Sequence, residues 1–300
     1  MKKFFTIIGL FCFGYLSYGQ QQVMFTQYMF NQLPLNAAYT GIHEGVSASM
    51  LWREQWVGFE GAPSTQTFSI HSPIAFRAIS LGGVIMRDKI GVSNQLSARF
   101  MYAYRLQIGK TKLSFGLEGS LHHYHSSHNE GGIDDPILAA ADQNVMKPNV
   151  GTGVLWHGSK FYVGVGIPNA MNQQFYDVEG SDSELVRHYY FTGGYVFAIY
   201  DNLLLKPNVM VKAVQGAPLQ ADFNMNVLLQ NTLWVGLSYR SFESMAGLVQ
   251  FQIGPKMQVG YSFDFWTTTD LSAVQSGSHE IMINYVFELP KTKILTPRYF

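Results

Sequence analysis

The feature of this sequence that most restricts its fold is an alternation of apolar and polar residues with a period of two. It is clearest from Met257 to Phe265, where every second residue is apolar and the residues between are Gln258, Gly260, Ser262 and Asp264. Neighbouring side chains in an extended strand point to opposite faces, so this run predicts a strand with one apolar and one polar face. Its length matches the roughly 9 to 11 residues that a tilted strand needs to cross a bilayer.

The same alternation recurs along the chain, most plainly in residues 94–106, 219–230 and 279–288. Together with the turns between the runs, it predicts about fourteen strands, an even number that returns both ends of a barrel to one side of the membrane. We place them at 44–52, 65–72, 79–87, 94–106, 111–124, 149–157, 159–166, 187–200, 202–213, 219–230, 232–240, 245–252, 256–265 and 279–288. Pro207 cannot donate a hydrogen bond to a neighbouring strand, so we expect a bulge or a strand end there.

The connections between these strands differ in length. Those after even-numbered strands are mostly tight turns, such as Gly109-Lys110, Gly158-Ser159, Asp201-Asn202, Gln230-Asn231 and Gly254-Pro255. The long connections, near 53–64, 125–148, 167–186 and 266–278, follow odd-numbered strands. Short periplasmic turns and longer extracellular loops are typical of outer-membrane barrels. The sequence therefore predicts an all-β fold, a transmembrane antiparallel β-barrel in the outer membrane of a Gram-negative cell.

The composition favours a lipid-facing wall over a water-facing one. Charged residues make up 13% of the chain, against about 25% in soluble domains, and no mature stretch approaches the roughly 20 apolar residues of a membrane helix. A secreted β-sandwich also alternates, but its polar face would carry many lysines and glutamates. Here the polar face is rich in Gly, Ser, Asn and Gln. The formal net charge of zero argues against nucleic acid as a partner.

The amino terminus is typical of a secretory signal peptide, residues 1–19. Lys2 and Lys3 precede an apolar run that ends near small residues, and cleavage near Gly19 would leave Gln20 as the first mature residue. The single cysteine, Cys12, lies inside this segment. The mature chain therefore has no thiol, and no redox chemistry is available to it.

Two regions remain after the signal peptide. Residues 20–43 mix aromatic and amide side chains. We expect this segment to plug the lumen or to lie against a periplasmic partner, and a disordered tail is the alternative. Residues 44–300 are expected to form the barrel, with a lumen lined by Arg99, Glu118, Asp222, Lys256 and Asp264.

Several motifs follow one another in a specific order. They are Gln27-Tyr28-Met29-Phe30-Asn31, Asn36-Ala37-Ala38-Tyr39-Thr40-Gly41, the block from Arg53 to Pro63, Gly277-Ser278-His279-Glu280-Ile281 and the final Pro297-Arg298-Tyr299-Phe300. This series resembles the PorP/SprF family of outer-membrane proteins of the type IX secretion system in Bacteroidota. Gln32 and Ala37 stand where the family often has proline, and Glu60 replaces a common Asp.

The resemblance implies a component of a protein-export and gliding-motility machine. Its implied partners are outer-membrane lipid, the C-terminal domains of secreted cargo, and other type IX components that export adhesins or attach them to the surface. The candidate partner-binding residues are Arg53, Glu54, Gln55, Trp56, Phe59, Tyr28, Phe30, His279 and Glu280. An interfacial aromatic belt is the other reading of Trp52, Trp56 and Phe59. The alternative function is a passive channel or hydrophobic-solute transporter.

Two groups of residues invite a chemical reading that the pattern does not favour. His122, His123, His125 and His128, with Asp134 and Asp135 nearby, could bind a metal, but they run from a strand into a polar loop where histidines are commonly solvated. Ser278, His279 and Glu280 carry the letters of a hydrolase triad, yet neighbours in a strand point to opposite faces. We therefore expect no enzyme activity, no cofactor and no metal.

Overall fold

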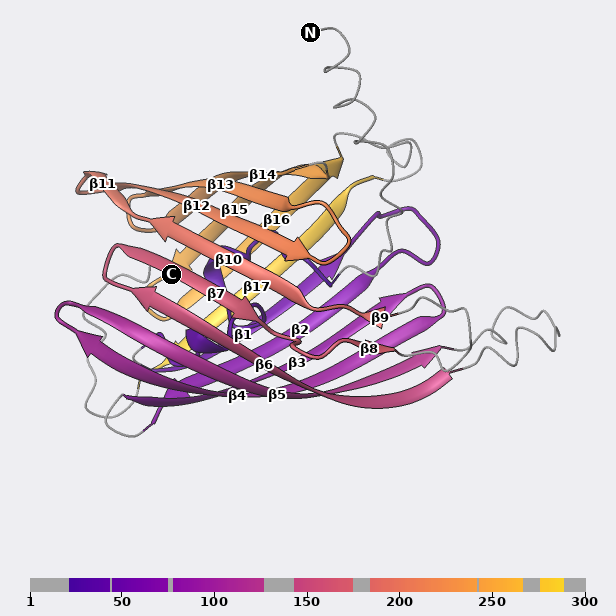
Figure 1. Ribbon diagram of the computed structural model, residues 1–300. Helices are drawn as coiled ribbons and strands as arrows, with labels where there is room; N and C mark the ends of the chain where they lie inside the picture. Colours follow the sequence, from indigo (N-terminus) through magenta and orange to yellow (C-terminus); the bar gives the residue numbers. More distant parts are fainter. Residues whose placement is uncertain are drawn as a thin grey trace, which may run out of the picture.

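The alternating runs form the strands of a closed antiparallel barrel in the computed structural model (Figure 1), which describes residues 22–43, 45–74, 78–126, 143–174, 184–241, 243–266 and 276–288. The strands are β1 (Val46–Glu54), β2 (Ser64–Pro73), β3 (Ile79–Ile90), β4 (Ser93–Ile108), β5 (Thr111–Ser126), β6 (Gln143–His157), β7 (Phe161–Ile167), β8 (Gln173–Gln174), β9 (Glu184–Leu185), β10 (His188–Tyr195), β11 (Phe197–Tyr200), β12 (Leu203–Val214), β13 (Gln220–Leu229), β14 (Leu233–Arg240), β15 (Ser244–Ile253), β16 (Met257–Trp266) and β17 (Ser278–Phe287). The 3-10 helices η1 (Tyr28–Phe30) and η2 (Ala37–Tyr39) precede β1.

The wall closes through three pairings between strands that are not consecutive along the chain, and one of them joins β7 to β10, with Val165 opposite Phe191. β1 pairs with β17, with Met50 opposite Ile283, and β10 pairs with β12, with Phe191 opposite Val211. β10 and β11 count as one wall strand interrupted at Val196, so the wall has 14 strands, while β8 and β9 form a separate two-stranded sheet. The predicted fold class is confirmed, and a closed sheet of this kind leaves no free edge across the bilayer.

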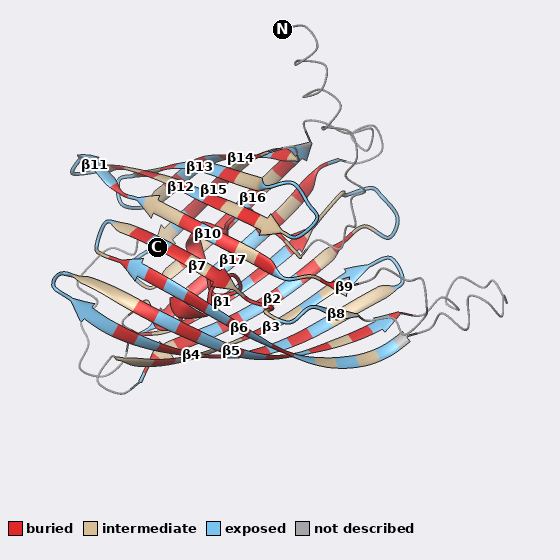
Figure 2. Cartoon of the chain, viewed as in Figure 1, coloured by how far each residue is buried: buried red, intermediate tan, exposed pale blue. Residues whose placement is uncertain are grey.

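Burial alternates along the strands as the period of two predicts. In β14, for example, every second residue from Trp234 to Arg240 is buried, and the three residues between them are exposed (Figure 2). The buried positions face the lumen and the exposed ones face outward, which is the lipid side of a membrane barrel.

The structure corrects some predicted boundaries. β1 begins at Val46 instead of residue 44 and continues to Glu54, and β6 begins at Gln143 instead of residue 149. The first part of β6 was missed because it contains Pro148, which breaks the strand signal. β7 pairs with β6 only from Thr152 onward, so no β7 residue needs a hydrogen bond from the proline.

Pro207 is tolerated for a related reason. β12 runs through this proline in regular register with β13, without the bulge or strand end that we expected there. The interruption lies instead in the neighbouring strand, because the partner of β12 changes from β10 at Asn208 to β11 at Leu205. Pro207 therefore lacks its N–H group at a point where the hydrogen bonds between β12 and its β10–β11 neighbour are already interrupted.

The two rims of the barrel differ. The periplasmic rim carries the tight turns 109–110, 158–160, 201–202, 230–232 and 254–256, and there β1 begins and β17 ends. The outer rim carries the connection 55–63, the ends of β7 and β16, and the starts of β10 and β17. No helix in the described part of the chain is long and apolar enough to cross a membrane.

Residues 22–43, which we call the plug, lie in the lumen between the two rims (Figure 1). At the outer rim, the Tyr190 hydroxyl donates to Gln22 Oε1 over 3.0 Å. Near the periplasmic rim, Gly41 N donates to His71 Nδ1 over 3.0 Å. The plug therefore starts at the outer rim and descends to the periplasmic rim, where β1 begins.

A row of glycines on three adjacent strands makes room for the plug. Gly116 of β5 pairs with Gly153 of β6, which pairs with Gly166 of β7. A Cβ atom on Gly116 would lie 2.1 Å from the backbone nitrogen of Ala38, and one on Gly166 would lie 2.1 Å from the Leu35 carbonyl oxygen. Any larger residue would collide with the plug backbone, so glycine is required at these positions.

Candidate functional site

The outer half of the plug is anchored by a buried network of charges. Arg53 of β1 places Nη2 2.6 Å from Asp264 Oδ2 of β16 and Nη1 3.1 Å from Glu280 Oε2 of β17. The Glu280 carboxylate also accepts hydrogen bonds from the backbone nitrogens of Thr26, at 2.9 Å, and Gln27, at 2.8 Å. The Thr26 hydroxyl donates to Asp264 over 2.7 Å and accepts from Arg53 over 3.0 Å. Wall and plug thus share one network.

A second clamp holds the middle of the plug. Arg99 of β4 forms a bidentate pair with Glu118 of β5, through contacts of 2.6 and 3.0 Å, and its Nη1 donates to the Pro34 carbonyl over 2.8 Å. Bidentate pairs of this kind hold a guanidinium in a fixed orientation. The orientation of Arg99 therefore fixes the position of the plug backbone.

The motif Gln27 to Asn31 packs against the opposite wall. Lys206 Nζ donates to the Met29 carbonyl over 3.2 Å and lies 4.7 Å from the centre of the Phe30 ring. The Tyr28 hydroxyl accepts a hydrogen bond from Asn224 Nδ2 over 3.0 Å. Burial raises the pKa of the Tyr28 phenol well above its usual value, so this group stays neutral. Tyr28 and Phe30 therefore bind the wall of the chain's own barrel.

The connection 55–63 forms an ordered ledge on the outer rim. Val57 N donates to the Gly277 carbonyl over 2.9 Å, and Gly91 N donates to the Gly61 carbonyl over 2.9 Å. Within the ledge, Trp56 has a positive φ of 48°, and its backbone nitrogen donates to Ser278 Oγ over 3.3 Å. The Phe59 side chain is 45% exposed. The ledge thus presents an aromatic side chain to the outside on a backbone tied at both sides.

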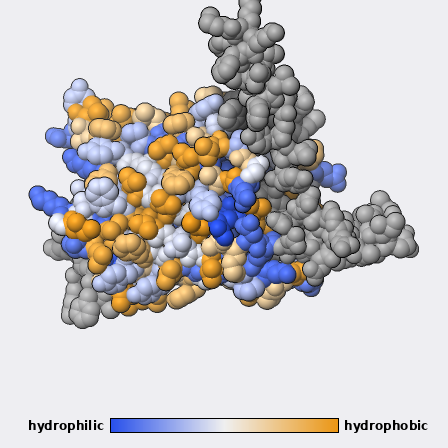
Figure 3. All heavy atoms as spheres, in the orientation of Figure 1, coloured by the Kyte–Doolittle hydropathy of each residue, from blue (hydrophilic) through white to orange (hydrophobic). Residues whose placement is uncertain are grey.

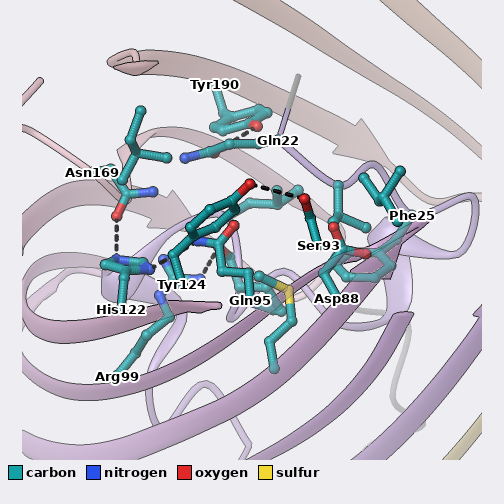
Figure 4. Close-up of a pocket in the computed structure, with 16 residues that line it drawn as sticks. Gln22, Phe25, Asp88, Ser93, Gln95, Arg99, His122, Tyr124, Asn169 and Tyr190 are labelled. Atoms are coloured by element: carbon teal, nitrogen blue, oxygen red, sulfur yellow. Dashed lines mark hydrogen bonds between the residues drawn. The ribbon is translucent and has the colours of Figure 1, made fainter. Parts of the chain in front are cut away.

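A cavity of about 330 Å³ lies beside the plug, lined largely by residues from the outer parts of β3, β4 and β5 (Figure 4). On one side, His122 Nε2 lies 3.0 Å from Asn169 Oδ1. On the other, the Tyr124 hydroxyl lies 2.9 Å from Ser93 Oγ. The lining also contains the charged side chains of Asp88 and Arg99, and apolar groups from the plug and the wall, among them Val23, Phe25, Leu35 and Met86. A mixed lining of this type suits a ligand with an apolar body and polar edges.

The predicted partner-binding residues fall into four groups. Arg53 and Glu280 face the lumen in the anchor network, and Tyr28 and Phe30 belong to the plug. Gln55, Trp56 and Phe59 lie on the ledge. Glu54 and His279 stand opposite each other on β1 and β17. The outward-facing Trp52 donates through its indole nitrogen to Glu54 Oε1, and the Tyr261 hydroxyl lies 2.7 Å from His279 Nδ1.

The other candidate groups can also be placed. Arg99, Glu118, Asp222 and Asp264 are buried toward the lumen as predicted, but Lys256 lies in a turn, 41% exposed, and pairs with Glu288 at 3.5 Å. Ser278 and Glu280 are buried, whereas His279 lies on the outward face, so the three do not form a triad. The described residues contain no group of His, Cys, Asp and Glu that could hold a metal. His128, Asp134 and Asp135 lie outside the described residues, as do the cleavage site near Gly19 and the final Pro297 to Phe300.

Comparison with known proteins identifies the family. A family profile described as the type IX secretion system membrane protein PorP/SprF matches residues 17–285, which include the plug, the ledge and nearly all of the wall. The chain belongs to the PorP/SprF family. The resemblance in the sequence motifs is thereby confirmed, and this PorP/SprF protein is an outer-membrane barrel of the type IX secretion system. No curated protein matches the chain.

Two solved structures are similar to this PorP/SprF protein. The CymD monoaromatic hydrocarbon channel is similar with a TM-score of 0.53 and 12% identity, covering 90% of this chain and 95% of that one. The outer membrane protein Omp33 of Acinetobacter baumannii gives a TM-score of 0.47 at 13% identity and covers 83% of this chain and all of its own. At 12% identity, the likeness to the CymD channel shows the fold alone.

Sequence reasoning missed the cavity. Its lining residues Gln22, His122 and Asn169 come from the plug, from β5 and from the connection after β7. The alternation indicated that Gln95 and Arg99 point inward, but no local signal shows which segments meet once the barrel closes.

Proposed function

We propose that this PorP/SprF protein is a binding component of the type IX secretion and gliding machinery. It binds the C-terminal domain of secreted cargo, or it binds other subunits of the machinery. In either case the binding serves the export or the surface attachment of adhesins. The binding is noncovalent, and the proposal requires no catalytic group. The observation that carries it is the lumen itself, because a plug fixed by buried ion pairs suits a barrel that holds partners better than one that conducts solutes.

The ledge supplies the surface for capture. Its backbone is hydrogen-bonded to Gly277 on one side and to Gly91 on the other, so little conformational entropy is lost when a partner binds. Val57 and Phe59 are exposed on it. Aromatic anchors on a rigid backbone are the residues that commonly dominate protein interfaces. We therefore assign partner contact to Gln55, Trp56 and Phe59, with Glu54 and His279 beside them.

A pull-down from detergent-solubilised membranes tests this assignment. Wild-type protein and the Phe59→Ser variant are compared for retention on an immobilised cargo C-terminal domain. We expect about a tenfold loss of affinity in the variant, as for an interface anchor. The matched control is Tyr200→Ser, which removes an aromatic that is 68% exposed near the periplasmic rim. Equal retention of all three proteins would contradict a role for the ledge, and no retention of wild type would contradict the proposed function.

One observation favours a second candidate, a passive channel or hydrophobic-solute transporter. The cavity beside the plug is partly apolar and large enough for a small organic molecule. A transporter predicts uptake of such a molecule, or ion conductance, in liposomes that contain the purified barrel. Capture predicts neither, so a flux measurement on the wild-type protein separates the two functions.

A further inference from the structure

The outward face of the barrel carries almost no charge. The exposed side chains on this face are largely apolar, as the orange areas of the wall show on one side (Figure 3). Within the described strands, the outward-facing residues with a formal charge are Glu54 on β1 and Arg87 and Lys89 on β3. All three lie close to the outer rim. Charge is therefore restricted to the height at which lipid headgroups begin.

Arg87 and Lys89 form a pair on one strand. Both are exposed and two positions apart, so they project from the same face of β3 with a spacing of roughly 6.6 Å along the strand. Ile85, the next outward residue toward the periplasm, is 55% exposed and belongs to the apolar belt. The two cations thus stand directly above the surface that contacts acyl chains.

The neighbouring strands extend this basic surface. Arg87 lies opposite Leu96 of β4, which lies opposite His123 of β5. Lys89 lies opposite Asn94 of β4, which lies opposite His125 of β5. His123 and His125 both lie on the outward face, as expected from their spacing. Toward β5, the outward rows beside the cations therefore contain imidazoles, amides and apolar groups but no carboxylate. Toward β1, Lys89 pairs with Ser64, which pairs with Glu54.

Within the described part of the chain, no acidic side chain forms an ion pair with either cation. Arg87 Nε donates to Asn94 Oδ1 over 3.2 Å. Asp88, between them, faces the lumen, where it accepts a hydrogen bond from Thr65 over 2.6 Å. Glu54 is engaged by the Ser64 hydroxyl at 2.6 Å. A cationic pair beside lipid attracts an anionic group.

We propose that Arg87 and Lys89 bind a phosphate of the phosphorylated glycolipid that forms the outer leaflet of the outer membrane. The guanidinium matches the geometry of phosphate oxygens, and the lysine adds a mobile point charge. The acyl chains of the same lipid lie against Ile85, Leu96 and Phe100. The bound lipid covers the outward face of β3 to β5 and fixes the height of the barrel in the membrane.

Native mass spectrometry of the purified full-length barrel with added lipid A tests the site. We expect wild type to retain lipid A bearing its phosphates about tenfold more strongly than dephosphorylated lipid A, the difference expected for lost charge-assisted contacts. The double variant Arg87→Gln with Lys89→Gln should bind both forms with the weak affinity that wild type has for the dephosphorylated form. Excess inorganic phosphate should not displace the lipid, because the acyl chains contribute to binding.

The matched control removes two exposed lysines from the opposite rim, as Lys110→Gln with Lys160→Gln. It should bind lipid A like wild type. The proposal is overturned if wild type does not distinguish the two lipid forms, or if the control loses as much binding as the double variant. Displacement by inorganic phosphate would also overturn it, since the site would then be a free-phosphate site. These outcomes are independent of cargo capture, because the pair lies on the lipid face and not on the ledge.

Discussion

Arg53 and Asp264 meet at 2.6 Å in the lumen although β1 and β16, which carry them, are not adjacent in the wall. β17 lies between the two strands and contributes Glu280 to the same guanidinium. The network therefore spans the place where the first and last strands close the barrel. Because Thr26 and Gln27 bind the same carboxylates, closure of the wall and seating of the plug depend on one side chain.

Replacement of Arg53 tests this dependence. Arg53→Met leaves Asp264 and Glu280 buried without their cation, and breaking a buried pair costs about 3 to 5 kcal/mol. Unfolding in detergent, followed by heat-dependent gel mobility, should show a matching loss. The control Lys256→Met breaks the ion pair between Lys256 and Glu288, in which the two side chains are 41% and 42% exposed. An exposed pair of this kind contributes about 0 to 1 kcal/mol to stability. Equal stability of the two variants would show that the network does not hold the barrel closed.

The glycine row gives a second prediction. In Gly116→Val, the new side chain would begin 2.1 Å from the Ala38 backbone nitrogen, so the plug must shift. Overpacking of this kind costs about 1 to 3 kcal/mol. Gly119→Val is the control on the same strand, because an added Cβ there meets nothing within 4 Å.

Protease sensitivity of the plug measures the result. We expect Gly116→Val to be cut within the plug faster than wild type, and Gly119→Val to resemble wild type. If both variants resist cleavage equally, the plug does not rely on the glycine row for its position.

The sequence predicted which residues face the lumen better than it predicted what they touch. The period of two placed Arg99, Glu118, Asp222 and Asp264 inside, because the pleat decides the face of each residue locally. It placed Lys256 in the lumen wrongly, because the alternating pattern begins one residue before β16, in the turn that precedes the strand. The face to which each side chain points is thus a local property, and the pattern of a single strand reveals it.

Contacts within the lumen are a different matter. Arg53 and Asp264 are separated by 211 positions, and their meeting depends on the stagger of the whole barrel. Residues 20–43, with Tyr28 and Phe30, were expected to plug the lumen or to lie against a periplasmic partner. Only the closed wall shows that Lys206 and Asn224 contact this segment. No local pattern contains that information.

The direction of the plug gives a last prediction. Gln22 lies at the outer rim, hydrogen-bonded to Tyr190, whereas Lys110 lies in a turn of the periplasmic rim. The sequence has one cysteine, Cys12, in the segment expected to be removed, so an introduced thiol would be the only one in the mature chain. On intact cells, a membrane-impermeant maleimide should label Gln22→Cys and not Lys110→Cys. After permeabilisation both should react, which controls for thiol reactivity. Labelling of Lys110→Cys alone on intact cells would mean that the barrel sits with the opposite rim outward, and both the ledge and the lipid site would then face the periplasm.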